Sequence, residues 1–169
     1  MEKMEFEYKV VNLSRVAKVT EGGKRLKIRA AVVIGNLNGL VGFGMGKGDD
    51  ISDAVMKAYN EAKKNLIQVS IVNETLPYEV KAKFKSAKVI IKPTRSGRGL
   101  IAGSVVRDIL YLAGYKNATT KILGVTKNSL VNAVVTLKAL EKLSQNYSRK
   151  IKLKEILYSR KKNDSDSSN

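Results

Sequence analysis

The segment at residues 25–34 restricts the fold of this chain more than any other, because apolar and polar side chains alternate along it with a period of two. Such alternation is typical of a strand with one buried and one exposed face. We therefore expect a half-buried strand with a basic outer edge. A preceding strand is predicted over residues 10–19, with a charged turn at residues 21–25 between the two. The expected buried side chains of the second strand are Leu26, Ile28, Ala30, Val32 and Ile34.

The pair Asn38-Gly39 follows this strand and suits the two central positions of a type I′ hairpin turn, which both need positive φ. A third strand is predicted over residues 40–45. If this pair forms the turn, Gly44 lies opposite Val33 on the face away from the core. That flat face would let an RNA backbone approach, so Gly44→Val is expected to keep the fold and to obstruct RNA binding. The glycines have an alternative explanation in strand twist, a bulge or close packing.

A helix is predicted after the third strand, because apolar residues recur at i, i+3, i+4 and i+7 from Ile51 onward. Asp49 or Asp50 can cap its first turn. The opposite face is polar and carries several lysines. This part of the chain therefore predicts a small antiparallel sheet covered by one helix. The expected inner face of the helix consists of Ile51, Ala54, Val55, Ala58, Ala62, Leu66 and Val69.

Pro77 interrupts these patterns, and the expected boundary between two units lies just before it. Beyond it, strands are predicted over residues 78–85, 89–93 and 118–124, the first two as an antiparallel pair with a basic exposed face. A helix over residues 103–113 is expected to end at Gly114, and a last helix to begin at Asn128 or Ser129. The predicted class is α+β, with one sheet-and-helix unit over residues 1–73 and a second α+β unit over residues 74–158. Residues 159–169 are expected to form a polar, disordered tail.

The chain carries 32 Lys and Arg against 15 Asp and Glu, a net charge of +17. Solubility of a small domain needs a net charge of only about 2–8. The excess therefore favours a polyanionic partner, first of all a nucleic acid. The absence of Cys and His removes disulfides, thiolate chemistry and the commonest general base and metal ligand. No segment resembles a signal peptide or is apolar enough to span a bilayer, so a soluble intracellular protein is expected.

Residues 42–48 form a candidate phosphate motif, because several glycines flank Lys47 just before a predicted helix. The spacing does not match a P-loop, which would need Gly at the position of Val41 and Ser or Thr at that of Gly48. Scattered carboxylates on the predicted helices are expected to form ion pairs with basic neighbours. The sequence therefore predicts no enzymatic activity, no catalytic residue, no metal site and no cofactor.

Two glycine-containing loops combine backbone freedom with guanidinium groups, which make bidentate contacts to phosphate. The first loop spans residues 22–25 and the second spans residues 95–99. We predict that both bind RNA, together with the basic edges of the adjoining strands and the glycine face of the third strand. The predicted RNA-binding residues are Arg15, Lys18, Gly22, Gly23, Lys24, Arg25, Lys27, Arg29, Gly42, Gly44, Gly46, Lys47, Arg95, Gly97, Arg98 and Gly99.

These residue types and spacings resemble the signature of bacterial-type small-subunit ribosomal protein five, over most of the chain between Asn12 and about Leu143. The resemblance implies a first unit related to double-stranded-RNA-binding domains and a second unit with a left-handed crossover. It also implies that the chain is a structural constituent of the small ribosomal subunit, supporting assembly and decoding accuracy. The matching stretches are residues 23–25, 30–47, 54–58, 92–93, 97–103 and 112–114.

The resemblance further implies the partners of the chain: small-subunit rRNA near the junction of head and body, ribosomal proteins four and eight, and messenger RNA at the nearby entry channel. Residues 19–25 match the family loop near the neck, and residues 97–99 match a region linked to decoding accuracy and to the contact with protein four. The expected location is a cytoplasmic ribosome, with an organellar ribosome as the alternative. Two other functions remain open: a free RNA-binding or chaperone-like module, and a nucleotide-dependent enzyme built on the second unit.

Overall fold

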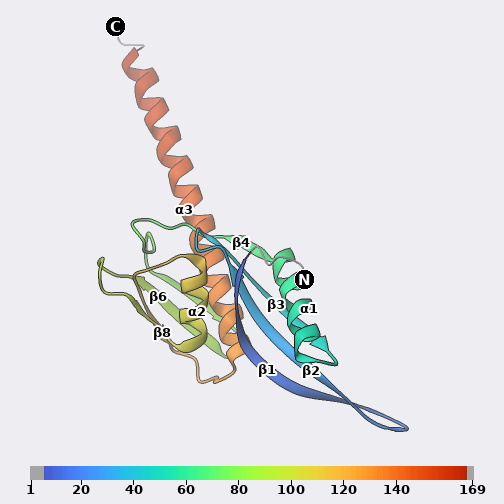
Figure 1. Ribbon diagram of the computed structural model, residues 1–169. Helices are drawn as coiled ribbons and strands as arrows, with labels where there is room; N and C mark the ends of the chain where they lie inside the picture. The colour runs from blue at the N-terminus through green and yellow to red at the C-terminus, as the bar shows by residue number, and fades with distance from the viewer. Residues whose placement is uncertain (1–5, 167–169) are drawn as a thin grey trace.

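The computed structural model describes the backbone of residues 6–166 and the side chains of residues 6–151. It contains two four-stranded sheets with helices packed against them (Figure 1). The first unit consists of β1 (Glu7–Thr20), β2 (Gly23–Gly35), β3 (Leu40–Gly48), α1 (Ile51–Lys64) and β4 (Leu66–Gln68). The second consists of β5 (Val80–Phe84), β6 (Ala87–Pro93), β7 (Leu100–Ile101), α2 (Ser104–Ala113), β8 (Ala118–Ile122) and α3 (Ser129–Asp166). The strand orders are β1-β2-β3-β4 and β5-β6-β8-β7.

This arrangement confirms the predicted α+β class with two sheet-and-helix units. The strand pairs are antiparallel except for β7 and β8, which run parallel. Because parallel strands need a crossover connection, α2 joins them across the sheet. The predicted boundary after residue 73 falls in the connection between β4 and β5, where Asn73 and Glu74 both have positive φ. The extents of the two domains stay a prediction.

The first sheet is covered on both faces, so β2 is not the half-buried strand that its alternation predicts. Residues 30–34 are each no more than 1% exposed. The even-numbered residues of this run pack against α1, whereas the odd-numbered residues share a core with α2. The prediction is wrong here because the second covering layer comes from a distant part of the chain. Only the N-terminal part of β2 is open, and Leu26 there is 66% exposed.

The connection between β2 and β3 differs from the predicted two-residue turn. Gly35 pairs with Val41, so five residues, 36–40, lie between the paired positions. The side chain of Asn36 organises this loop, because its Oδ1 accepts hydrogen bonds from the amides of Asn38 and Leu40, both at 2.9 Å. Hydrogen bonds to a side chain therefore hold this connection in place of the predicted two-residue backbone turn.

The longer loop shifts the register of β3 by one residue. Gly44 lies opposite Val32, and not opposite Val33 as predicted. Because side chains alternate along a strand, a shift of one residue exchanges the two faces. The glycines of β3 therefore share a face with the residues that pack on α1.

Helix α1 begins after Asp50 as expected but ends at Lys64, earlier than the predicted end at Val69. Residues 66–68 instead form β4, which pairs with the start of β3. Ile51, expected on the inner face, lies in the first turn and is 53% exposed. The small side chains on the buried face let the helix approach the sheet closely. The buried residues of α1 are Ala54, Ala58, Tyr59 and Ala62.

The helix ends of the second unit follow the predicted signals. Gly114 ends α2 in the left-handed conformation with φ of 99°, and Asn128 accepts a hydrogen bond from the Leu130 amide at the start of α3.

Strand β7 has no sequence signal, because two residues are too few to show alternation. Helix α3 continues to Asp166, past the predicted start of a disordered tail at residue 159. The segment contains neither Gly nor Pro to end the helix, and residues 167–169 lie outside the described part.

The two units share one hydrophobic core, and backbone hydrogen bonds join them directly. The amide of Leu37 donates to the carbonyl of Leu112 at 3.0 Å, and the amide of Gly39 donates to that of Ala113 at 2.9 Å. The β2–β3 loop and the C-terminal end of α2 therefore form a junction. This junction places the two sheets relative to each other.

Candidate nucleic-acid interface

Strands β1 and β2 extend beyond the rest of the first sheet as a two-stranded arm (Figure 1). β2 pairs with β3 only from Ile28 onward, whereas β1 and β2 stay paired as far as Thr20 and Gly23. We call residues 16–27 the arm. Most of its residues are exposed, since neither α1 nor the second unit covers this part of the ribbon. Its side chains can therefore reach a large partner without any change in the core.

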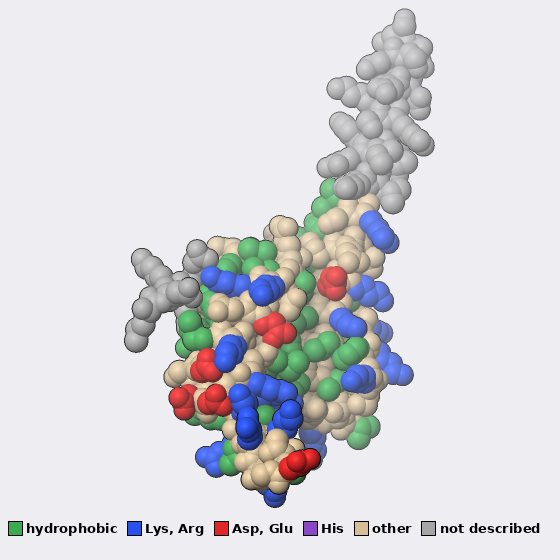
Figure 2. Space-filling model, turned by 90° about the vertical axis from the view of Figure 1, so that its right-hand side faces the viewer, with side chains coloured by type: hydrophobic (Ala, Val, Ile, Leu, Met, Phe, Trp, Pro, Cys, Tyr) green, Lys and Arg blue, Asp and Glu red, His purple; other side chains and the backbone are tan. Residues whose placement is uncertain are grey.

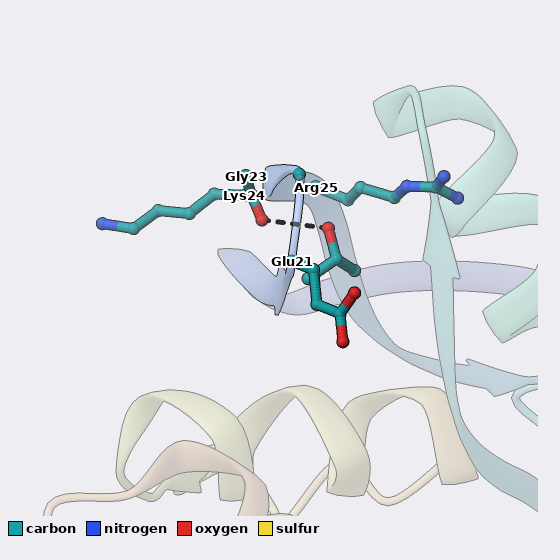
Figure 3. Close-up of a pocket in the computed structure, with 6 residues that line it drawn as sticks. Glu21, Gly23, Lys24 and Arg25 are labelled. Atoms are coloured by element: carbon teal, nitrogen blue, oxygen red, sulfur yellow. Dashed lines mark hydrogen bonds between the residues drawn. The ribbon is translucent and has the colours of Figure 1, made fainter.

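The tip of the arm is a tight turn with an open surface. The Thr20 hydroxyl donates to the Gly23 carbonyl at 3.0 Å, and Gly23 has φ of 133°. A Cβ at Gly22 or Gly23 would meet no atom within 4 Å, so these glycines serve the turn and not packing. The turn lines a hollow, and Lys24 and Arg25 point to opposite sides of it (Figure 3).

One face of the arm is basic and continues onto the sheet. The β1–β2 register places Lys18 directly opposite Arg25, with Lys27 two residues further along the same face. The β2–β3 register then places Arg29 opposite Lys47 on that face. Figure 2 shows Lys and Arg side chains gathering at the lower end of the molecule, where the arm lies. We call these five residues the basic strip.

The basic strip retains most of its positive charge. Lys27 pairs with Asp49 at 3.2 Å, but both side chains are exposed, and such pairs contribute only about 0–1 kcal/mol. The Nε of Arg29 donates to the Ser14 hydroxyl at 3.2 Å, which orients the guanidinium without neutralising it. Like charges that face each other across two strands repel. A polyanion bound along the strip would relieve that repulsion.

The predicted cations of β1 and β2 do not all lie on one face. Arg15 and Lys24 occupy the opposite face, beside Val19 and Leu26. Val19 is 72% exposed and Leu26 is 66% exposed. The structure thus separates the predicted cations into the basic strip on one face and a mixed apolar and basic surface on the other.

The second predicted loop, residues 95–99, connects β6 to β7. Gly97 and Gly99 have φ of 86° and 73°, conformations that favour glycine. The Gly99 amide donates to the side-chain oxygen of Asn117 at 3.0 Å and anchors one end of the loop. Arg95 and Arg98 are exposed. The loop therefore presents two guanidinium groups from a fixed backbone.

The glycines of β3 belong to the core and not to an RNA surface. Gly42, Gly44 and Gly46 are buried against α1. A Cβ at Gly44 would lie within 3.0 Å of the Ala58 carbonyl oxygen and the Ala62 amide nitrogen. The expectation that these three glycines line an open surface for RNA is therefore wrong. Close packing, the alternative explanation, accounts for them.

Five lysines of the second sheet form a single surface that the sequence did not predict as a whole. The strand registers bring these lysines to the solvent face of β5, β6 and β8. The sequence predicts a basic exposed face for the antiparallel pair at residues 78–85 and 89–93, but only the strand registers show which lysines lie side by side and that Lys121 of β8 joins them. We call this surface the outer lysine face, and it consists of Lys81, Lys83, Lys88, Lys92 and Lys121.

Two of the carboxylates on the helices form ion pairs, as expected, and a third, that of Glu61, accepts a hydrogen bond from the Met45 amide at 3.0 Å. Asp53 pairs with Lys57 at 2.7 Å, and Asp108 pairs with Lys9 at 2.9 Å. Among the described residues, no three or more acidic, Cys or His side chains group closely enough to hold a metal ion. In the same part of the chain, no helix is both long and apolar enough to cross a membrane.

Both halves of the chain match models of one protein family. Residues 6–70 match "Ribosomal protein S5, N-terminal domain", and residues 82–152 match "Ribosomal protein S5, C-terminal domain". Small ribosomal subunit protein uS5 of Thermotoga neapolitana is 44% identical over 139 residues, which cover 82% of this chain and 78% of that protein. The chain belongs to the ribosomal protein S5 family. The arm lies in the first S5 domain, and the loop at residues 95–99 lies in the second.

A second relative supports the same assignment. The uS5 protein of Thermotoga maritima is 43% identical over 139 residues, with the same shares of both chains covered. S5 proteins are structural components of the small ribosomal subunit and not enzymes. The predicted family, the ribosomal role and the lack of enzymatic function are therefore confirmed.

Proposed function

We propose that this S5 protein binds small-subunit rRNA through the basic strip of the arm and through the arginines at residues 95–99. The observation that carries the proposal is the register of the arm, which aligns Lys18, Arg25 and Lys27 on one exposed face. Phosphates of an RNA backbone would neutralise this row and release counterions. The arginines can add bidentate contacts to phosphate.

The family resemblance supports a specific place for these contacts within the small ribosomal subunit. The arm would lie near the neck, where head and body of the small subunit meet, close to the messenger entry channel. The loop at residues 95–99 would lie at the contact with ribosomal protein four, and protein eight would be the other neighbour. In this position the chain would support subunit assembly and decoding accuracy.

Replacing Lys18 and Arg25 together by Gln is expected to weaken binding of the full chain to a small-subunit rRNA fragment. Each lost phosphate contact lowers the slope of log affinity against log salt by about 0.7–0.9, so the double variant should lose about 1.5. Titration at several salt concentrations measures this slope. The matched control is Lys57→Gln/Lys116→Gln, which removes the same charge from residues paired with Asp53 and Glu74. Equal slopes for the two variants would contradict the role of the arm.

Replacing Arg95 and Arg98 by Ala should lower incorporation into small subunits or decoding accuracy, while leaving the stability of the free protein nearly unchanged. Both side chains are exposed, and surface substitutions usually stay within about 0.5 kcal/mol. Thermal melting and a misreading reporter assay test the two parts. A marked drop in melting temperature would mean that the arginines are structural.

The alternative of a free RNA-binding module predicts a different distribution in the cell. A ribosomal component should sediment with small subunits after a high-salt wash, whereas a free module should remain in the supernatant. The S5 domain matches over both halves of the chain favour the first outcome.

A further inference from the structure

The second sheet has one buried and one open face. Val80, Val89 and Ile91 point inward and are at most 4% exposed, packed in the core that includes α2 and α3 residues. Lys81, Lys83, Lys88 and Lys92 alternate with these inward-pointing residues along β5 and β6, and all four are exposed. This open side is the outer lysine face.

The strand registers set the lysines of this face in successive rows. Lys83 and Lys88 lie directly opposite each other. Two residues along, Lys81 and Lys121 flank Ile90 from the two neighbouring strands. Lys92 follows after two more residues on β6. Since a strand rises about 3.3 Å per residue, the lysines cover about 13 Å along the strands.

Most of this charge has no acidic counterpart. Glu79 accepts hydrogen bonds from Lys81 at 3.1 Å and from Lys92 at 3.2 Å. These two ammonium groups lower the pKa of the Glu79 carboxyl. Lys83 and Lys88 have no carboxylate partner in the part of the chain that the structure describes, although like charges in opposite positions destabilise a sheet. Repulsion between these lysines therefore destabilises the sheet, and a bound anion would reduce that repulsion.

The charge continues around the β5 edge of the sheet. The ammonium of Lys138 on α3 stands 4.0 Å from the centre of the Phe84 ring, and Lys142 lies one helical turn further on. These two lysines line one hollow together with Lys81, Lys83 and Lys88 of the sheet. A ligand on the outer face would therefore meet cations from α3 as well as from three strands.

We propose that the outer lysine face is a second RNA-binding surface, which binds the sugar–phosphate backbone of duplex RNA without reading its sequence. Lysine supplies a point charge and no planar fork for base edges. Among the described residues, the outer face carries no aromatic side chain on which an unpaired base could stack. Lysine is also depleted from protein–protein interfaces, which favours a nucleic acid over a protein. The surface lies on the second sheet and does not depend on the contacts proposed for the arm.

The test uses the full chain and two RNA duplexes of unrelated sequence. The variant Lys83→Gln/Lys88→Gln is expected to bind both duplexes about tenfold more weakly at low salt, with a salt slope smaller by about 1.5. Lys57→Gln/Lys116→Gln, with the same change in net charge, should bind like the parent chain. Binding of the first variant equal to that of this control would overturn the proposal. The arm variant, measured on the rRNA fragment, reports separately on the arm.

Two further outcomes separate this proposal from its competitors. Lys83→Arg/Lys88→Arg keeps both charges and should bind like the parent chain, and a loss of binding there would show that the lysines act through folding. The free Lys83→Gln/Lys88→Gln protein should melt at the same temperature or higher, because a like-charge pair has been removed. If this variant is lost from small subunits while duplex binding is unchanged, the face binds an acidic protein, and the RNA proposal is wrong.

Discussion

Gly44→Val is expected to destabilise the protein by about 3 kcal/mol or more, a large part of the stability of a typical domain. A side chain at this position would collide with the backbone of α1 at Ala58 and Ala62. Backbone atoms cannot rotate away as the end of a side chain can, so α1 would have to leave the sheet. In urea unfolding, the midpoint should fall by about 1.5 M.

The neighbouring residue Met45 provides the control for Gly44→Val. Its side chain lies on the other face of β3 and is 43% exposed. Met45→Val introduces the same β-branched side chain into the same strand without meeting α1, and it should change stability by about 0.5 kcal/mol or less. Equal stability of Gly44→Val and Met45→Val would contradict the close packing of α1 on the glycines of β3.

Gly114→Ala is expected to destabilise the junction between the two units by about 3 kcal/mol, through two effects that add. Gly114 has φ of 99°, which is strained for any residue with a Cβ. The new Cβ would also lie within 3.0 Å of the Leu37 carbonyl oxygen and carbon. The loop would move away from α2, and the hydrogen bonds donated by the amides of Leu37 and Gly39 would weaken. Thermal melting should show the loss of stability, and hydrogen exchange at these two amides should become faster.

Gly97→Ala is the control that measures the effect of backbone strain without a collision between the new Cβ and a neighbouring atom. Gly97 also has positive φ, 86°, but a Cβ there would meet no atom within 4 Å. Its substitution should therefore cost only about 1 kcal/mol and should leave exchange at the junction unchanged. Equal losses for Gly97→Ala and Gly114→Ala would show that the close approach at Leu37 contributes nothing.

Local interactions and summed charge could be predicted from the sequence. The strands of the arm, the left-handed end of α2 at Gly114 and the Asn128 cap of α3 depend on residues close to one another in the chain. The excess of Lys and Arg indicates a polyanionic partner whatever the fold. The spacing of the glycines and cations sufficed to indicate the ribosomal family, because such a pattern needs no knowledge of contacts.

The face on which a residue lies was decided only by tertiary structure. A connection of five residues between paired positions, in place of a two-residue turn, moved Gly44 from the predicted open face to the one beneath α1. The reason is that alternation along a strand gives two faces but does not say which layer covers each. Likewise, the lysines of the second sheet come from three strands, and the register between β6 and β8 aligns residues about thirty positions apart in the chain. Sequence alone therefore determined the charge and the kind of partner, whereas the packing of distant segments determined where that charge gathers.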